Sequence, residues 1–273
     1  MASSQKKRAM TMESGTDSFS MDEEIQADFE GRNLEEQDFN GIRQLLRQLF
    51  LKEHVDVSKI SDMLIAQEGI GSVLKQSWNE DEEDDEEDDT LTEALDVFGV
   101  TSVLNLSSNR DTGVIQQLFE LMQRITKDNV EDTTTNKIND ILNNANRLGL
   151  LINERFVNLP PKISDPLFTS LLEELSRMAK RDPSYKFDYI ILICKIYKSK
   201  RSKENIIFSN AEEEIFQNDA DVSVEYNVSS QCDTALVGQW DAGDSEMIPF
   251  RRILFIHGSK FPSIIEKVKA FVS

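Results

Sequence analysis

The chain has 273 residues, of which 39% are hydrophobic, enough to bury one sizeable α/β core or two small ones. Its formal net charge is −20, from 50 acidic and 30 basic side chains. No stretch approaches the roughly 18 to 20 apolar residues of a membrane span, and the start, MASSQKKRAM, lacks the apolar core of a signal peptide. We therefore expect a soluble intracellular protein, and the presence of only Cys194 and Cys232 agrees with a reducing compartment.

Residues 1–37 are polar, acidic and poor in periodic apolar positions, so we expect a disordered acidic tail. Near its start, Lys6, Lys7 and Arg8 resemble a short nuclear-import signal. A cluster of three basic residues occurs as readily without that role, so the cluster leaves both interpretations open.

The folded body is expected to begin at Asp38, because apolar residues then recur at intervals of three and four through Phe50 and predict a helix. A second helix is predicted over 58–69 and a short strand over 72–76. An acidic loop at 79–90 follows, and mutual repulsion should keep it extended and solvated. Its ten consecutive carboxylates are Glu80, Asp81, Glu82, Glu83, Asp84, Asp85, Glu86, Glu87, Asp88 and Asp89.

The negative charge lies almost entirely in two segments. The ten-carboxylate run contributes −10, and residues 13–38 contribute −9, which leaves the rest of the chain nearly neutral. The run is either a solvated loop that keeps the protein soluble or a counter-surface for a basic partner, and it would repel nucleic acid.

Strand and helix patterns alternate through the rest of the chain. Strands are predicted at 97–106, 150–156, 185–197, 206–208, 221–228 and 251–257, and helices at 112–129, 136–146, 165–178 and 262–272. The run YKFDYIILICKIY at 185–197 is the strongest strand signal and should cross the middle of a sheet. We therefore predict one α/β domain over 38–273, with a mixed twisted sheet covered by helices.

Motifs of common catalytic sites are missing from the sequence. His54 and His257 are the only histidines, and there is no P-loop, Gly-x-Gly-x-x-Gly, Gly-x-Ser-x-Gly or Cys-x-x-Cys element. Nothing in the pattern indicates an enzyme, a cofactor or a metal. A basic cluster could meet RNA, DNA or an acidic protein, or could form a solvated loop; it comprises Lys195, Lys198, Lys200, Arg201 and Lys203.

Several stretches resemble the BCCIP family, whose name describes a partner of a breast-cancer susceptibility protein and of a cyclin-dependent-kinase inhibitor; its fungal members are the Bcp proteins. They are DFNGIRQLLRQLF, GSVLKQ before the acidic insertion, VFGVTSVLNL, GLLINERFVNLPPKI, FSNAEEEIF, CDT with a later Trp240, and RRILFIHGSKF. The resemblance runs in order from Asp38 to the C-terminus, and NERFVNLPP and NAEEE are its most specific motifs.

The resemblance implies a nuclear protein, with shuttling to the cytoplasm left open, that acts in large ribosomal subunit assembly by chaperoning a basic ribosomal protein. It also implies protein partners in homologous recombination and in cell-cycle control, namely a recombination mediator and a cyclin-dependent-kinase inhibitor. We expect no membrane or direct nucleic-acid binding. A recombination or cell-cycle adaptor without a chaperone role, using apolar surface around 206–216, is an alternative.

The resemblance further implies a fold similar to the GCN5-related acetyltransferases (GNAT) without their catalysis. Those enzymes hold a pyrophosphate on backbone amides of a Gln/Arg-x-x-Gly-x-Gly/Ala turn. Here Gly113 follows Arg110 at that spacing, but Ile115 occupies the last small-residue position, and its branched side chain would obstruct the phosphates. A surviving acetyl-CoA-dependent acetyltransferase remains the alternative from another class of protein.

Overall fold

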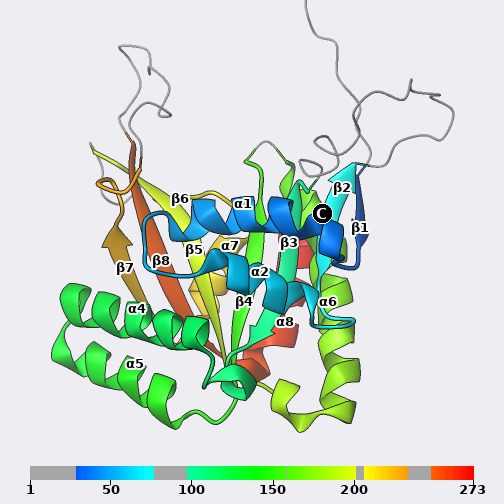
Figure 1. Cartoon of the computed structure of the whole chain (residues 1–273). Coiled ribbons are helices and arrows are strands. Elements are labelled where there is room, and N and C mark those ends of the chain that lie inside the picture. The colour runs from blue at the N-terminus through cyan, green and yellow to red at the C-terminus, as the bar shows by residue number, and fades with distance from the viewer. Residues whose placement is uncertain (1–28, 77–96, 158, 201–205, 233–246) are drawn as a thin grey trace, which may run out of the picture.

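The structure, a computed structural model, describes residues 29–76, 97–157, 159–200, 206–232 and 247–273 (Figure 1). The strands are β1 (Phe29–Arg32), β2 (Ser72–Gln76), β3 (Gly99–Asn105), β4 (Leu148–Arg155), β5 (Tyr189–Ser199), β6 (Ile206–Phe208), β7 (Val222–Asn227) and β8 (Met247–His257). The α-helices are α1 (Phe39–Phe50), α2 (Val57–Ile65), α4 (Gly113–Asn129), α5 (Asp132–Asn144), α6 (Ser164–Arg181), α7 (Glu213–Asp219) and α8 (Phe261–Val272).

The described strands form one mixed sheet in the order β1-β2-β3-β4-β5-β8-β7, with β6 also pairing with β5. β4 and β5 run parallel, and the other pairs are antiparallel. β5 lies in the middle of the sheet and pairs with β8 over its whole length. The predicted mixed α/β architecture is therefore confirmed, and the finer likeness to the acetyltransferase fold stays a prediction.

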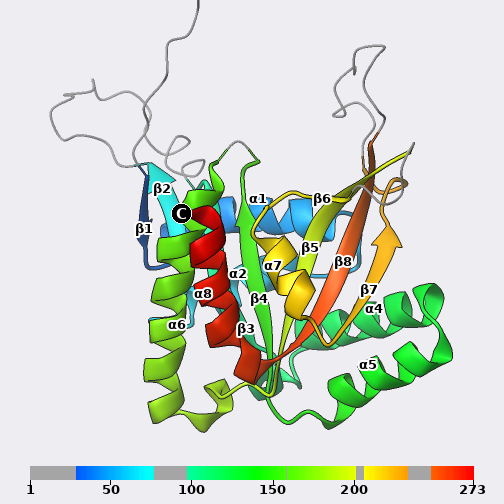
Figure 2. The same cartoon turned by 180° about the vertical axis from the view of Figure 1, so that it is seen from behind.

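Helices cover both faces of the sheet. α1, α2, α4 and α5 lie on the face seen in Figure 1, and α6, α7 and α8 lie on the face seen in Figure 2. Each layer buries its own hydrophobic cluster against the strands, and alternate residues of a strand such as Ile190 and Ile191 belong to opposite clusters, as the pleat requires. The result is a three-layer arrangement around one sheet.

The α1 layer follows directly from the spacing of its apolar residues. Ile42, Leu45 and Leu46 are fully buried, because intervals of three and four place them on one helical face. Burial of each such side chain is worth about 1.5 to 3 kcal/mol. Asp56 begins α2 by accepting a 3.1 Å hydrogen bond from the backbone N–H of Lys59, which satisfies one of the unpaired donors at the helix start.

The expected tail boundary at residue 37 is wrong, because β1, at Phe29–Arg32, already belongs to the sheet. β1 pairs with β2 along its length, and Phe29 packs edge-on against Phe98 at 5.2 Å between ring centroids. Asp38 is buried. Its carboxylate accepts a hydrogen bond from Arg32 at 2.9 Å and forms an ion pair with Lys75 at 3.1 Å. Pairing between distant strands, rather than local periodicity, orders this segment.

The other predicted elements are present; the strands at 72–76 and 206–208 have the predicted bounds, and most of the rest have shifted ends. The helix predicted at 136–146 begins earlier, at Asp132, the strand predicted at 185–197 begins later, at Tyr189, and the strand predicted at 251–257 begins at Met247. α7 was not predicted. Among the described helices, none combines the length and apolar character that a bilayer crossing needs.

Candidate functional site

The first feature of note is the gap where β4 and β5 diverge. The two strands pair only from Leu148 with Tyr189 to Leu151 with Leu192, and beyond that point they spread apart (Figure 2). The segment before α7 bridges the gap. The backbone N–H of Ser209 donates to the carbonyl of Lys195 on β5 at 2.9 Å, and the side-chain amide of Asn210 donates to the carbonyl of Asn153 on β4 at 2.8 Å. Backbone groups on both strands therefore find partners in this segment.

Buried ion pairs fill the same gap. The guanidinium of Arg155 donates hydrogen bonds from two nitrogens to the carboxylate of Glu212, one of them at 2.7 Å to Oε2. Both side chains are almost completely buried. On the opposite face of the sheet, Lys195 pairs with Glu154, also in the interior. Two-pronged hydrogen bonding is the geometry in which a buried pair can offset its desolvation cost.

Glu213 lies beside these pairs without a cation of its own. Its Oε1 accepts from the amide of Asn153 at 3.0 Å and from the amide of Asn210 at 2.8 Å. Burial raises the pKa of Glu213 to about 8, with further increases from the neighbouring carboxylates of Glu212 and Glu154. A pKa this high favours the protonated carboxyl at neutral pH, and Oε2 has no hydrogen-bond partner among the described residues.

Two other groups respond to the same cluster. Burial raises the pKa of the Cys194 thiol well above its usual value, and Glu213 adds to the increase, so this thiol is neutral and unreactive. Burial alone would lower the pKa of Arg155, but the hydrogen bonds and charge of Glu212 outweigh it, and the net pKa is raised. The cluster therefore combines two buried ion pairs with Glu213 and Cys194, whose pKa values burial raises.

The two most specific sequence motifs meet in this cluster. NERF, at residues 153–156, lies at the end of β4, and NAEEE, at residues 210–214, leads into α7. The sequence singled out both motifs but gave neither a role. The structure shows that they close the gap between β4 and β5 with the chain's own side chains.

The segment with the acetyltransferase-like spacing packs inside the fold. Arg110 donates to the carbonyl of Leu142 at 2.6 Å and lies over the ring of Phe119, 4.6 Å from its centroid. Ile115 is fully buried in the first turns of α4. Through these contacts the segment connects α4 to α5 inside the fold.

Two residues of the basic cluster predicted around 195–203, Lys195 and Lys198, lie on β5 and not in a loop. Lys195 is buried on β5, and Lys198 pairs with Glu225 and lies 4.9 Å from the ring centroid of Phe250. The strand extends further than predicted, to Ser199, and brings these two lysines to acidic partners. Arg201 and Lys203 lie outside the described residues.

The remaining sequence candidates have no catalytic surroundings within the described part of the chain. Lys6, Lys7 and Arg8, and the run from Glu80 to Asp89, lie outside it. His54 and His257 are exposed and far apart in the sequence, and the ring of His257 contacts Ser259 in the short 3-10 helix before α8. No group of three or more possible metal ligands occurs among the described residues.

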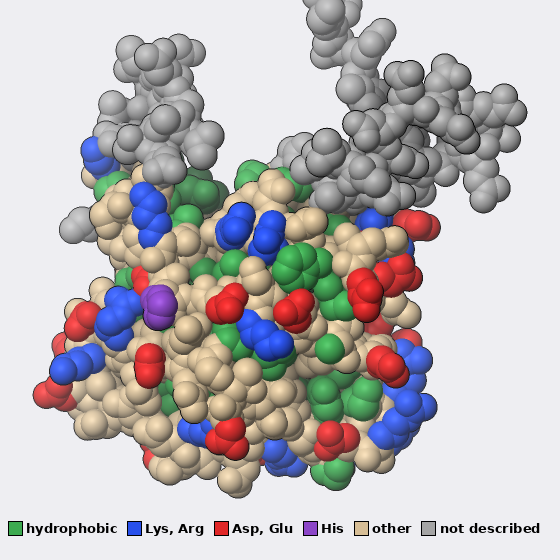
Figure 3. All heavy atoms as spheres, viewed as in Figure 1, with side chains coloured by type: hydrophobic (Ala, Val, Ile, Leu, Met, Phe, Trp, Pro, Cys, Tyr) green, Lys and Arg blue, Asp and Glu red, His purple; other side chains and the backbone are tan. Residues whose placement is uncertain are grey.

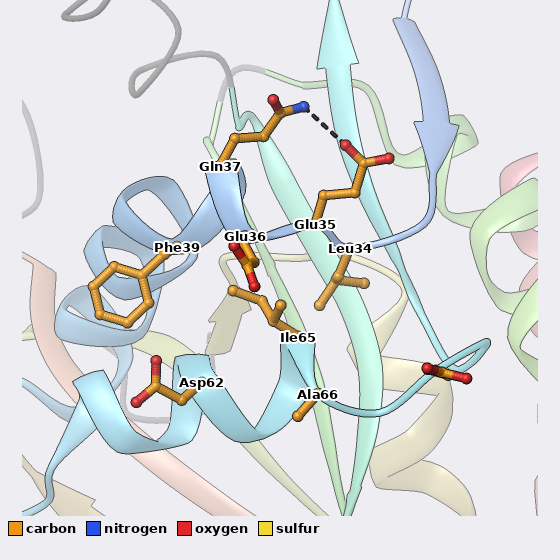
Figure 4. Close-up of a pocket in the computed structure, with 9 residues that line it drawn as sticks. Leu34, Glu35, Glu36, Gln37, Phe39, Asp62, Ile65 and Ala66 are labelled. Atoms are coloured by element: carbon orange, nitrogen blue, oxygen red, sulfur yellow. Dashed lines mark hydrogen bonds between the residues drawn. The ribbon is translucent and has the colours of Figure 1, made fainter.

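An open groove lies between the start of α1 and the end of α2. Its volume is 970 Å³, and its described lining residues are Leu34, Glu35, Glu36, Gln37, Phe39, Asp62, Ile65, Ala66 and Glu68. Figure 4 shows Leu34, Glu36 and Ile65 pointing toward one another across it. On the same face of the molecule, hydrophobic and acidic side chains lie beside one another (Figure 3). We call this feature the α1/α2 groove.

The α1/α2 groove is lined by acidic and by apolar side chains; we call its carboxylates the rim, and Leu34, Phe39 and Ile65 the floor. Four carboxylates and no Lys or Arg occur among its described lining residues. Glu35 pairs with Arg32 at 2.9 Å, and Lys59 approaches Asp62 only to 4.0 Å. Glu36 and Glu68 are exposed, and neither carboxylate has a hydrogen-bond or ion-pair partner among the described residues. The arrangement can bind a surface that combines apolar and basic side chains.

Comparisons with known proteins agree with these features. The BCCIP family model matches residues 24–221. The Protein BCCIP homolog of Drosophila melanogaster is 37% identical over 94% of this chain and 88% of its own length. The BRCA2 and CDKN1A-interacting proteins of Homo sapiens and Bos taurus are 36% and 35% identical, over 93% of this chain and 83% and 85% of their own lengths.

A solved structure has the same fold. The crystal structure of BCP1 from Saccharomyces cerevisiae matches with a TM-score of 0.55 at 19% identity, over 93% of each chain. The family model spans both motifs that close the gap between β4 and β5, and the curated relatives match nearly the whole chain. The chain therefore belongs to the BCCIP family.

Proposed function

We propose that the protein is a non-enzymatic nuclear adaptor and chaperone that binds basic proteins, including a large-subunit ribosomal protein, and supports ribosome biogenesis. The observation that carries the proposal is the α1/α2 groove, which joins an apolar floor to four carboxylates. Relatives are named for interacting with BRCA2 and CDKN1A, which supports protein partners and a link to DNA repair and cell-cycle control.

The closed gap between β4 and β5 supports a non-enzymatic role. Splayed parallel strands offer unpaired backbone groups to a ligand, but here Ser209 and Asn210 occupy those positions. The chain between β4 and α6 carries Pro160 and Pro161, which have no backbone N–H to offer a phosphate. The family's names are not enzyme names.

The competing acetyltransferase function makes a direct prediction about ligand binding. Titrating the full chain with acetyl-CoA by calorimetry should give no heat of specific binding under the proposed function. Saturable tight binding would overturn it and would require the segment from Ser209 to Glu213 to leave the gap.

The basic client is expected to bind with a strong dependence on salt. The Debye length falls from about 10 Å at 0.1 M salt to roughly 3 Å at 1 M, so attraction by exposed carboxylates weakens across that range. A variant lacking 1–28 and 80–89 should associate more slowly with a lysine-rich protein and show a flatter salt slope. An unchanged slope and association rate would show that these segments serve solubility alone.

The partner class separates a chaperone from a recombination or cell-cycle adaptor. Affinity capture from nuclear extract with the full chain should recover ribosomal proteins as well as repair and kinase-control proteins. Capture of the second group alone would favour the adaptor without a chaperone role.

Nuclear localisation rests on Lys6, Lys7 and Arg8 in this proposal. Changing all three residues to alanine should lower the nuclear concentration of a fluorescently tagged chain. An unchanged nuclear signal would assign import to another segment or to a co-imported client.

A further inference from the structure

We propose that the α1/α2 groove docks an amphipathic, lysine- or arginine-rich helix of a partner protein. This inference rests on the proposed function and assigns it a surface. The apolar floor, the helical walls and the negative charge of the rim each favour such a helix as the ligand of the groove.

The apolar floor supplies the anchor site. Leu34, Phe39 and Ile65 are each only partly buried, although neighbouring residues on the same helices, such as Ile42 and Leu64, are fully buried. Leu34 and Ile65 also pack against the main hydrophobic cluster, so the floor is continuous with the core. An apolar side chain entering the groove would bury surface on both sides, worth about 25 cal/mol per Å².

The walls favour a helix over an extended strand. The groove is lined by the short 3-10 helix Glu36–Asp38, the first residue of α1 and the last turn of α2, and no strand edge contributes to its described lining. Without an exposed strand edge, a partner cannot add to the sheet through backbone hydrogen bonds, so side chains must carry recognition. A helix bound in a groove is recognised through its side chains in this way, with apolar anchor residues on one face.

The charge of the rim selects a basic partner. The carboxylates of Glu36 and Glu68 have no cation partner in the described structure, so both can accept charge-assisted hydrogen bonds from an incoming Lys or Arg. A second groove, between α6, α8 and the start of β5, has a volume of 430 Å³; among its described lining residues, Arg147, Lys186 and His257 are basic and Asp188 is the one acid. The two grooves therefore predict opposite charge preferences.

The test compares charge reversal inside and outside the groove. The probe is a fluorescently labelled helical peptide with leucine on one face and lysine elsewhere, titrated with the full chain by fluorescence anisotropy. The groove variant is Glu36→Lys with Glu68→Lys. The matched control is Glu120→Lys with Glu266→Lys, because these exposed glutamates lie on α4 and α8, have no ion-pair partner among the described residues and give the same change in net charge.

Wild type and control variant should bind the peptide with dissociation constants within about threefold, and the groove variant about tenfold more weakly or worse, because reversed rim charges repel the lysines. The floor is tested by Ile65→Ser, which should also weaken binding. Ile207→Ser is its control, since Ile207 is a 56% exposed hydrophobic residue on β6. Circular dichroism of each variant confirms folding before its binding is compared.

The possible outcomes distinguish a failure of the groove inference from a failure of the proposed function. If groove and control variants bind the peptide equally, the groove inference is overturned while the proposed function stands. If wild type binds neither this peptide nor a lysine-rich protein, the proposed function itself fails. If the chain forms dimers that Glu36→Lys with Glu68→Lys abolishes, the occupant is a second copy and the inference of a basic partner helix is wrong.

Discussion

The gap between β4 and β5 and the α1/α2 groove both contain several carboxylates, but these differ in burial and in pairing. In the gap, Glu154 and Glu212 are buried and each is paired with a cation. In the groove, Glu36 and Glu68 are exposed and have no cation partner among the described residues.

The difference follows from solvation. A buried carboxylate loses its hydration and must be paired or protonated, so the gap can hold only a carboxylate set that is already satisfied. An exposed carboxylate keeps its water until a partner displaces it, so the groove can hold unsatisfied charge at little cost. The carboxylates in the gap are therefore already paired or protonated within the fold, and those in the groove remain available for binding.

The largest predicted effect comes from breaking the pair in the gap. Arg155→Met leaves Glu212 buried without a cation, and loss of one partner of a buried pair typically costs about 3 to 5 kcal/mol. Urea denaturation should show this decrease in the free energy of unfolding. Adding Glu212→Leu should recover much of the loss, because no unpaired charge then remains. A loss below about 1 kcal/mol for Arg155→Met would mean that water reaches Glu212.

Glu213 gives the next largest effect, and it depends on pH. Its folded pKa of about 8 lies above the unfolded value near 4.5, so between these pH values the unfolded chain releases a proton that the folded chain keeps. Wild-type stability therefore falls as pH rises through this window. Glu213→Gln removes the ionisation, and each pH unit is worth up to about 1.4 kcal/mol.

Unfolding free energies at pH 5 and pH 8 test this directly. The advantage of Glu213→Gln over wild type should grow by about 2 to 4 kcal/mol between these two pH values. Glu214→Gln is the control, because Glu214 is the exposed neighbour on α7, and its difference from wild type should stay flat. A flat difference for Glu213→Gln as well would place Glu213 in contact with solvent.

The sequence predicted the elements whose signal is local. The threefold and fourfold spacing of α1 and the apolar run of β5 each define a buried face without reference to the rest of the chain. α7 was not predicted because only Ile215 and Phe216 are apolar among its residues. The acidic triplet Glu212–Glu214 also looks like a solvated surface. Glu212 is buried because it meets Arg155, 57 positions earlier in the sequence.

The candidate groove could not be predicted for the same reason. Its walls come from residues 34–39 and 62–68, and the sequence assigned most of the first segment to a tail. β1 is ordered by pairing with β2, about forty residues later, which local periodicity does not reveal. The motifs NERF and NAEEE marked the gap, but their complementarity became visible only when both were placed in space.

The groove charges should have little effect on folding, which sharpens the contrast with the gap. Glu36→Lys with Glu68→Lys should change the free energy of unfolding by no more than about 0.5 kcal/mol per site, since both side chains are exposed and have no partner in the described part of the chain. Urea denaturation beside Glu120→Lys with Glu266→Lys provides the comparison. A loss as large as that of Arg155→Met would show that the groove acids hold the fold together.

The smallest effect is expected from the acidic run itself, the third set of carboxylates in the chain. Deleting Glu80 to Asp89 removes ten mutually repelling charges and leaves the other ten residues of 77–96 to join β2 to β3. These strands are antiparallel neighbours, with Leu74 opposite Gly99, so a much shorter connection would suffice and loop closure should become slightly easier.

Thermal denaturation should therefore show an unchanged or higher Tm for this deletion. A variant that replaces the ten residues with a glycine and serine sequence of equal length separates the effect of charge from that of loop length. If charge repulsion matters, both variants should gain stability at low salt, and the gain should fade as salt screens the run in the wild type. A large drop in Tm for the deletion but not for the replacement would mean that the fold needs the length of the connection. A drop for both would show that the carboxylates make contacts that stabilise the folded body, and the run would then resemble the gap rather than the groove.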